Sequence, residues 1–299
     1  MVTLLPQHLL IYCGKRMRHL IKTPGIIHNG LPGSCHNLII KMVTTSDIDN
    51  NNNIDIPPSM TTSSEDELII DIYGDIDQVP LTPPPVNYFL EHAILTLQNV
   101  HVQDTNNKIL KKMQGNNIIY HGADTLDDEG DGIPTDIPHD FLRMIESPSL
   151  PLSDLQMKIG CPLMILRNLD AGKGLCNRTR SILLHAYSRV LEVMIISGDR
   201  WGEKAFIPRI SLKPPSRQYP FTLRRCQFPV RLSFAMTINK SEGQSIKYVG
   251  IHLMSPVFCH GQLYVTLSRA TSHNNVHILL PTTSYSKTTN VVYSEVLLD

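Results

Sequence analysis

The stretch "IKYVGIHLMSPVFCHGQLYVTLSRATSHNNVHILL" at residues 246–280 decides the fold class of this chain. It begins with the apolar run "IKYVGIHL" and ends with "VHILL", and both runs have the composition of buried strands. Between them, "GQLYVTLSRATS" places Leu263, Leu267 and Ala270 at helical spacing. A strand, a helix and a strand in succession predict part of a parallel α/β domain.

The residues before this stretch add further strands and one helix. "YFLEHAILTLQN" (88–99) predicts a buried strand that leads into a loop, and "VQDTNNKILKKM" (102–113) has helical spacing. From 157 to 213, short β-rich runs alternate with Gly, Asp and Asn turns. That rhythm predicts a small, strongly bent sheet or barrel. "QFPVRLSFAMTI" (227–238) predicts one more apolar strand.

Three polar segments lie in the N-terminal half. Residues 44–66 are polar and rich in Asn, so we expect them to bury nothing. "LTPPPVN" (81–87) is a stiff connector because consecutive prolines hold the backbone extended. "DTLDDEGDG" (124–132) clusters carboxylates, but it lacks the ligand spacing and the closing Glu of a calcium loop. We therefore expect a solvated loop there.

The net charge of +0 hides a strong asymmetry along the chain. Residues 44–150 carry 19 acidic and 4 basic side chains, whereas residues 151–299 carry 18 basic and 8 acidic ones. A basic C-terminal half favours a polyanionic partner, for which nucleic acid is the usual candidate. The alternative is an ordinary solvated basic face.

The six cysteines fit neither a zinc site nor a disulfide framework, because none forms a C-x-x-C pair and their spacing is wide. Cys161 and Cys176 lie in apolar surroundings, which predicts buried thiols in a reducing compartment. No apolar run approaches the ~18 residues that a membrane span needs, so we expect no membrane partner. Residues 1–22 lack the order of a secretory signal; they lack acids, as mitochondrial transit peptides do, but are poor in Ser.

The segment "FAMTINKSEGQS" (234–245) combines Lys, Gly and hydroxyl residues, as phosphate sites often do. A phosphate-cradling loop reads G-x-x-x-x-G-K-[ST], however, and here Lys240 precedes Gly243. That loop pattern occurs nowhere in the 299 residues. No apolar strand ends in an Asp-Glu pair suited to Mg²⁺, so we expect no metal site in this chain.

Four motifs together resemble the C-terminal half of a Pif-type DNA helicase, a superfamily-one family that includes the helicases of Helitron transposons. The motifs are "IGCPLMILRNLDAGKGLCNRTR", "IPRI", "QFPVRLSFAMTINKSEGQS" and "PVFCHGQLYVTLSRATS". They come in the family's order and at its separations. The likeness is dense from residue 88 to 281 and also touches "NIDIPPSM" (53–60).

The resemblance implies an α/β fold with one RecA-like domain that is interrupted by a small β-barrel. The expected divisions are a largely disordered, acidic segment at 1–60, the start of the second RecA-like domain with the acidic loop at 61–156, the inserted barrel at 157–213, and the remainder of the RecA-like domain at 214–299. The phosphate loop and the magnesium ligands would then belong to a missing N-terminal RecA-like domain.

The resemblance also implies roles for individual residues. DNA contacts are implied for Thr237, Asn239 and Lys240, and nucleotide contacts for Gly243, Ser245 and Asn99. The match at Asn99 and at Thr96 before it is looser, because Leu97 and Gln98 replace the family's Pro and Thr. Alternatively, residues 240–243 are only a polar helix end with a glycine cap.

Arg269 is the implied catalytic residue, since the family motif carries an Arg that reaches the γ-phosphate of ATP. A planar guanidinium stabilises charge that spreads over phosphoryl oxygens. We expect Arg269 at a helix end near the edge where open α/β sheets gather ligands. The alternative is a surface Arg that interacts only with the helix dipole.

Two residues depart from the family pattern. Glu242 stands where the family usually has Gln, and it brings a carboxylate to a site for phosphates, which would weaken nucleotide or DNA affinity. Arg178 replaces a Gly in "GLCNRTR", and Arg is poor at positive φ, so this turn is expected to differ or to be strained.

The implied function is part of an ATP-dependent 5′-to-3′ DNA helicase that uses ATP and Mg²⁺ and acts in repair, recombination or telomere maintenance. Without the phosphate loop, we expect this chain to be inactive alone. The implied partners are single-stranded DNA and the missing domain, and the implied compartment is the nucleus, with the mitochondrion as an alternative. A second hypothesis is a binding module that contacts single-stranded DNA without turnover.

Overall fold

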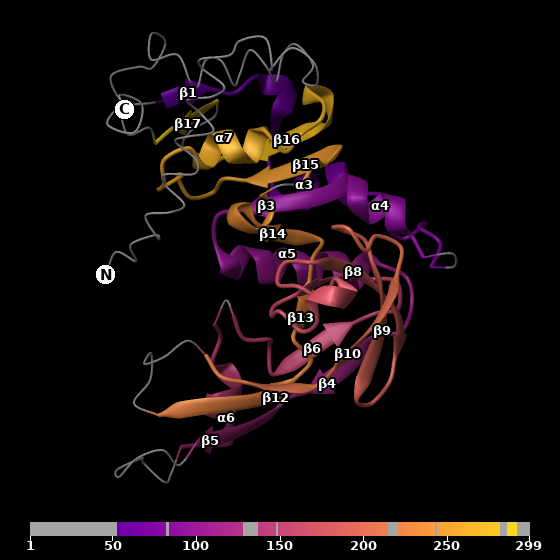
Figure 1. The fold of residues 1–299 in the computed structure, drawn as a ribbon. Helices are drawn as coiled ribbons and strands as arrows, with labels where there is room; N and C mark the ends of the chain where they lie inside the picture. The colour runs from indigo at the N-terminus through magenta and orange to yellow at the C-terminus, as the bar shows by residue number, and fades with distance from the viewer. Residues whose placement is uncertain are drawn as a thin grey trace. The chain divides into compact units, whose positions relative to one another are not determined.

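The computed structural model describes residues 53–81, 84–127, 137–147, 149–214, 221–242, 244–281 and 286–291 (Figure 1). Its contacts divide the chain into two compact units. The described residues of the first unit come from 53–74, 91–102 and 236–291, and those of the second unit from 75–90 and 103–235. Each unit therefore joins segments that lie far apart in the sequence.

The first unit is built on a five-stranded sheet with the order β14-β3-β15-β16-β2. Its strands are β2 (Thr61–Thr62), β3 (His92–Thr96), β14 (Ala235–Thr237), β15 (Tyr248–His252) and β16 (Val276–Leu279). The pairs β3–β15, β15–β16 and β16–β2 are parallel. Helix α7 (Gln262–Leu267) lies in the connection from β15 to β16. The α/β class and the strand–helix–strand order predicted from residues 246–280 are thus confirmed.

Helix α3 (Glu65–Tyr73) packs against this parallel sheet, although the sequence analysis did not predict it. Ser64 caps it by accepting a hydrogen bond from the Glu67 amide at 3.1 Å. The close approach of the helix to β15 requires a glycine at 250. A Cβ there would lie 2.9 Å from the Ile94 side chain and 3.0 Å from that of Ile72.

Residues 53–60 correct one expectation about the N-terminal half. β1 (Asn53–Asp55) pairs antiparallel with β17 (Lys287–Thr289), and the 3₁₀ helix η3 covers Pro58–Met60. Ile54, Ile56 and Met60 are buried. The prediction that 44–66 buries nothing is therefore wrong for this part, because single apolar residues between the polar ones face the core. The rest of the predicted disordered segment, up to residue 52, lies outside the described residues.

The predicted strand and helix around residue 100 are both present. β3 is buried along most of its length, and α5 covers Asn99–Lys112. In the second unit, α5 buries Asn106, whose Nδ2 donates to Leu232 O at 3.3 Å and to Ala235 O at 3.1 Å. The Ala235 amide donates to Asn106 Oδ1 at 2.8 Å. One polar side chain thus fixes the backbone that leaves β13.

The second unit is dominated by antiparallel strands. A five-stranded sheet has the order β10-β9-β8-β7-β13, a three-stranded sheet the order β11-β12-β5, and β4 pairs with β6. The strands are β4 (Ile118–His121), β5 (Ala123–Asp127), β6 (Asp154–Met157), β7 (Pro162–Ile165), β8 (Arg180–Ala186), β9 (Val190–Ile195), β10 (Lys204–Pro208), β11 (Ile210–Leu212), β12 (Thr222–Gln227) and β13 (Val230–Leu232). Its short helices include α4 (Val86–Glu91, with Glu91 at the division), η4 (Ala171–Lys173) and α6 (His139–Met144).

The β-rich character predicted for 157–213 is confirmed by β7 to β11. The five-stranded sheet continues past residue 213, since β13 pairs with β7. The contacts also divide the chain at 102/103 and at 235/236. The closure of these strands into a barrel, and the predicted division into domains, stay predictions.

The acidic segment 124–132 is not a solvated loop over its first residues. Residues 123–127 form β5, which pairs with β12, while 128–132 lie outside the described residues. The Asp124 side chain is only 4% exposed, and its partner Arg225 is 1% exposed. Arg225 Nε donates to Asp124 Oδ1 at 2.7 Å, and Nη2 donates to Oδ2 at 2.9 Å. A buried ion pair replaces the expected hydration.

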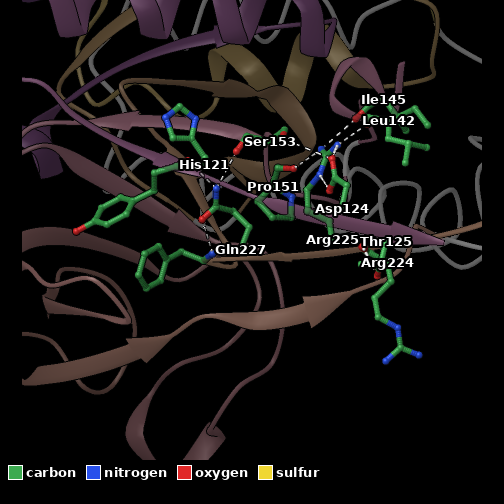
Figure 2. Close-up of polar contacts among 12 residues, drawn as sticks. His121, Asp124, Thr125, Leu142, Ile145, Pro151, Ser153, Arg224, Arg225 and Gln227 are labelled. Atoms are coloured by element: carbon green, nitrogen blue, oxygen red, sulfur yellow. Dashed lines mark hydrogen bonds and ion pairs between the residues drawn. The ribbon is translucent and has the colours of Figure 1, made fainter. Parts of the chain in front are cut away.

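The same guanidinium also binds three backbone carbonyls (Figure 2). Arg225 Nη2 donates to Leu142 O at 2.7 Å, and Nη1 donates to Ile145 O and Pro151 O at 3.1 Å each. All five guanidinium donors are therefore used. They join β12 and β5 to the end of α6 and to the irregular chain that follows it.

Arg178 has a strained backbone, as the sequence predicted. Its φ is 72°, and it is the only non-glycine residue with positive φ in the described part of the chain. Arg178 N donates to Ile165 O at 2.8 Å, and Asn177 N donates to Asn168 Oδ1 at 2.8 Å. These hydrogen bonds hold the turn before β8 in the left-handed backbone conformation that glycine adopts most easily.

We predict that Arg225→Met strongly destabilises the second unit. The substitution leaves the Asp124 carboxylate buried without a charged partner, which costs about 3–5 kcal/mol in the free energy of unfolding. Urea denaturation monitored by circular dichroism measures this loss.

Arg224→Met is the matched control for that measurement. Arg224 is the exposed neighbour on the same strand, and Figure 2 shows its side chain pointing away from the network. We expect its effect to stay within about 0.5 kcal/mol. Arg225→Met combined with Asp124→Leu should recover part of the loss, because no charge then remains buried. Equal stability of the two single variants would show that the pair contributes nothing.

We predict that Arg178→Gly stabilises the protein. Glycine removes a left-handed strain of about 1–2 kcal/mol, which its greater freedom in the unfolded chain offsets by about 0.4–1 kcal/mol. A net gain of roughly 0.5–1 kcal/mol should raise the melting temperature by about 1–4 °C. Arg189→Gly is the control, since Arg189 is an exposed turn residue without positive φ. A lower melting temperature for Arg178→Gly would contradict the strain.

Candidate functional site

The parallel sheet of the first unit has two chemically different edges. The register pairs Tyr248 with His92 at the start of β15 and β3, and His252 with Thr96 at their ends. Residues that follow Thr96 and His252 therefore lie at the carboxyl edge. Residues that precede His92 and Tyr248 lie at the amino edge.

The segment 237–245 follows the edge strand β14. Thr237 ends the strand and is half-buried, the 3₁₀ helix η5 covers Ile238–Lys240, and Asn239 is exposed. Ser241 is buried and donates its hydroxyl to Ile238 O at 2.7 Å. The described residues show a single 3₁₀ turn closed by Ser241; the glycine cap of the alternative interpretation falls on Gly243, outside them.

This turn is followed by Glu242, which departs from the family pattern, and by Gly243 and Ser245, for which nucleotide contacts are implied. Ser245 is exposed, and Glu242 is half-buried. Gly243 lies outside the described residues. The Gln244 amide donates to Ser241 O at 3.0 Å, which continues the turn toward Ser245.

Arg269 belongs to the same cluster as this segment. Helix α7 packs beside η5. Arg269 Nη1 donates to Gln244 O at 3.3 Å, Nε donates to Val265 O at 3.1 Å, and Nη2 donates to Ser268 Oγ at 3.0 Å. Its half-buried guanidinium therefore ties the end of α7 to the segment that carries the predicted DNA and nucleotide contacts.

The position of Arg269 corrects one expectation. The Ile246 amide donates to Arg269 O at 2.9 Å, and Ala270 bridges Ile246 in parallel. Ile246 precedes β15, so Arg269 lies at the amino edge and not at the carboxyl edge. The cause is the crossover: a helix between two parallel strands runs back along them and ends where the next strand begins. The catalytic role of Arg269 stays a prediction.

Asn99 lies at the opposite edge from Arg269. It begins α5, three residues after β3 ends at Thr96. Thr96 is fully buried, and its hydroxyl donates to Gln98 O at 2.9 Å, so its polar group serves its own turn. The structure therefore brings 237–245 together with Arg269 but does not bring Asn99 to them.

The sequence analysis missed a histidine pair at the carboxyl edge. The rings of His101 and His252 lie 4.6 Å apart between centroids. His252 ends β15, and His101 lies in the first turn of α5, two residues after Asn99. Their signal was topological: His252 ends β15, and His101 lies five residues after the end of the neighbouring parallel strand β3.

A cavity of about 250 Å³ lies within the second unit and contains none of the predicted site residues. Its polar lining includes Gln103, Asn107, Arg143, Glu146, Asp154 and Arg231. Burial lowers the pKa of Arg231, while the Glu146 carboxylate opposes that shift. Arg231 Nη2 donates to Ser147 O and Leu150 O at 2.6 Å each, which shows a structural use for this guanidinium.

Neither a metal centre nor a membrane segment is found in the part of the chain that the structure describes. No three His, Cys, Asp or Glu side chains gather there as metal ligands would. The helices of these residues are all too short or too polar to cross a bilayer.

Comparisons with known proteins find similarity to DNA helicases. Residues 140–185 match the family described as DNA helicase Pif1, 2B domain. The chain is 32% identical over 160 residues to the ATP-dependent DNA helicase PIF1 of Homo sapiens, which covers 47% of this chain and 23% of that protein. With the Rattus norvegicus protein it shares 30% over 185 residues, covering 58% and 25%. The chain thus spans about a quarter of the curated relatives that it matches.

Solved structures show the same relationship at the level of the fold. The Pif1 helicase of Candida albicans matches with a TM-score of 0.53 and 18% identity, covering 88% of this chain and 56% of that one. Bacteroides Pif1 bound to single-stranded DNA matches with a TM-score of 0.51 and 18% identity, covering 90% and 52%. The resemblance read from the four motifs is confirmed: this chain is similar to a part of the Pif1 DNA helicases, and its fold is of the RecA-like α/β class.

Proposed function

We propose that this chain supplies the second RecA-like domain, with its inserted 2B region, of a Pif-type ATP-dependent 5′-to-3′ DNA helicase. One observation carries the proposal. Arg269 is hydrogen-bonded to the carbonyl of Gln244, inside the segment whose residues match the family's DNA and nucleotide motif. A phosphate-directed cation and a DNA-directed loop thus form one cluster on one unit.

Arg269 is the group that this chain would present to the γ-phosphate. To reach it, the guanidinium must leave Val265, Gln244 and Ser268. Breaking these three hydrogen bonds costs about 0.5–1.5 kcal/mol each. An arginine that stabilises phosphoryl transfer accelerates it by roughly 10³ to 10⁵, which is about 4–7 kcal/mol in the barrier. The lowering of the barrier exceeds the cost of breaking the three hydrogen bonds over most of that range. The observed position of the Arg269 guanidinium therefore suits a resting state.

Thr237, Asn239 and Lys240 would contact the DNA backbone. A hydroxyl and an amide donate hydrogen bonds to phosphate, and an ammonium adds charge. Asn239 is exposed, and the other two are half-buried at the end of β14 and in η5. Single-stranded DNA is therefore the proposed partner, as it is in the solved Bacteroides complex.

ATP would be shared with a partner domain. Arg269 fits the phosphates of a nucleotide, whereas the described residues contain no cluster suited to Mg²⁺. The phosphate loop is absent from the 299 residues. We therefore propose that an N-terminal RecA-like domain on another polypeptide, or on a longer form of this one, holds the metal and completes the site.

A second candidate is a DNA-binding module that contacts single-stranded DNA without turnover. The absent phosphate loop favours it, and Glu242 adds a carboxylate beside the phosphate-directed groups. For the helicase proposal we retain repair, recombination or telomere maintenance as the process. The nucleus is the proposed compartment, and imaging of a tagged chain distinguishes it from the mitochondrion.

We predict that the purified chain alone hydrolyses no ATP, with or without single-stranded DNA, and that fusion to an N-terminal helicase domain of the family restores DNA-stimulated turnover. In that fusion, Arg269→Ala should lower turnover at least a hundredfold, a floor below the range for such arginines. Steady-state phosphate release measures both.

Ser268→Ala is the control for the Arg269 variant. It removes one hydrogen-bond partner of the guanidinium and keeps the charge. We expect turnover within a few-fold of the parent. If Arg269→Ala behaves like Ser268→Ala, the catalytic assignment is wrong. If every fusion binds DNA but none hydrolyses ATP, the binding module is the better description.

We predict weak, sequence-tolerant binding of single-stranded DNA that falls steeply with salt. Each phosphate contact adds about 0.7 to the slope of log K against log salt for single strands. Lys240→Ala should therefore lower that slope by about 0.7, measured by fluorescence anisotropy with oligo(dT) between low and moderate salt. Lys173→Ala is the control, since Lys173 is exposed, pairs with Asp170 and lies outside the 237–245 segment. An unchanged slope for Lys240→Ala would remove it from the DNA site.

A further inference from the structure

Two large aromatic side chains of the five-stranded sheet remain open to solvent. Phe206 on β10 is 58% exposed, and Tyr187, directly after β8, is 53% exposed. Such rings bury well in cores, so their exposure on a regular sheet needs a reason. Together with His185, we call them the aromatic face.

A nearly buried carboxylate organises this face. Glu192 on β9 has a side chain only 12% exposed. Lys204 Nζ lies 3.1 Å from its Oε1, and His185 Nδ1 lies 3.0 Å from its Oε2. The Lys204 contact, and after it the His185 contact, lower the pKa of this carboxyl against the effect of burial. Both oxygens are occupied, so the negative charge is compensated within the face.

The register fixes where the rings lie. Phe206 and His185 are the cross-strand neighbours of Glu192 on its two sides. Neighbouring strands lie about 4.8 Å apart, so these two side chains originate roughly 10 Å from each other. The His185 and Tyr187 rings are stacked, with centroids 6.2 Å apart and 26° between their planes. The face thus offers separated, oriented rings rather than a continuous apolar patch.

Charge distinguishes between classes of partner. Glu192 is the only carboxylate on β8, β9 and β10, and it is already paired. Lys204 and Arg189, beside the face, are exposed cations. Rings with cations around them match a strand of bases with a phosphate backbone. Lys204 already pairs with Glu192, so Arg189 is the cation that an apolar protein surface would leave without a counter-charge.

We propose that the aromatic face stacks the bases of a single-stranded nucleic acid, with Lys204 and Arg189 directed to its phosphates. This inference rests on the proposed function, and it assigns part of the DNA contact to β8, β9 and β10 rather than to the 237–245 segment. Glu192 is a positioning residue, since it holds Lys204 and His185.

The test compares oligo(dT) with an abasic strand of equal length and charge, using fluorescence anisotropy. We expect the parent to bind oligo(dT) more tightly than the abasic strand. Phe206→Ala with Tyr187→Ala should weaken oligo(dT) binding about tenfold or more, since base stacking contributes about fivefold or more per ring. The same variant should leave abasic binding nearly unchanged.

Two controls separate stacking from folding. Trp201, in the turn between β9 and β10, is 57% exposed and is the only tryptophan of the chain. Trp201→Ala should bind like the parent, and the Trp201 fluorescence of the other variants reports that the hairpin is intact. Phe206→Tyr with Tyr187→Phe keeps both rings and should retain the preference for bases.

Each outcome distinguishes the proposed function from the role of the aromatic face. If the parent does not bind oligo(dT), the proposed function itself fails. If the parent binds but the double Ala variant binds oligo(dT) equally well, the aromatic face is not the stacking site. Unchanged DNA binding with lost self-association in that variant would place a protein on the face and overturn the inference.

Discussion

The second unit depends on one buried guanidinium. Arg225 gives two hydrogen bonds to Asp124 and three to the carbonyls of Leu142, Ile145 and Pro151. Those carbonyls belong to the end of α6 and to irregular chain, where no ladder supplies donors. Backbone groups left unpaired in a core cost about 1–3 kcal/mol each. A single side chain therefore allows this irregular segment to be buried beside β12.

Gln227 lies two residues further along β12 on the same face, and its side chain also donates to backbone carbonyls. Its Nε2 donates to Tyr120 O at 2.8 Å and to Ser153 O at 2.9 Å, and its Oε1 accepts from the Phe228 amide at 3.0 Å (Figure 2). The two side chains connect β12 to segments that hydrogen-bonded strand ladders do not reach. Polar networks that are fully satisfied in this way specify one arrangement of the chain.

The sequence predicted those elements whose signal is local. Apolar runs located β3, β15 and β16, and helical spacing located α5 and α7. It failed at Asp124, because the burial of that carboxylate depends on an arginine 101 positions away, and no local pattern records such a pair. Ile54, Ile56 and Met60 were missed for a related reason, since each is a single apolar residue in a polar context. Arg178 was foreseen because φ preference belongs to the residue itself.

The candidate site also has features that the sequence could predict and features that it could not. The family resemblance singled out Thr237, Asn239, Lys240 and Arg269, and the crossover rule could have placed Arg269 at the amino edge. The conformation of Arg269 could not be derived, because it depends on carbonyls presented by Gln244 and by the last turn of α7. Those acceptors compete with a phosphate for one guanidinium. A phosphate oxygen carries more charge than a carbonyl and binds a guanidinium more strongly, so a nucleotide held nearby would draw Arg269 away. The bond to Gln244 would then break, and the 237–245 segment would lose one constraint. On the proposed function, nucleotide and DNA contacts would thereby be linked through this one side chain.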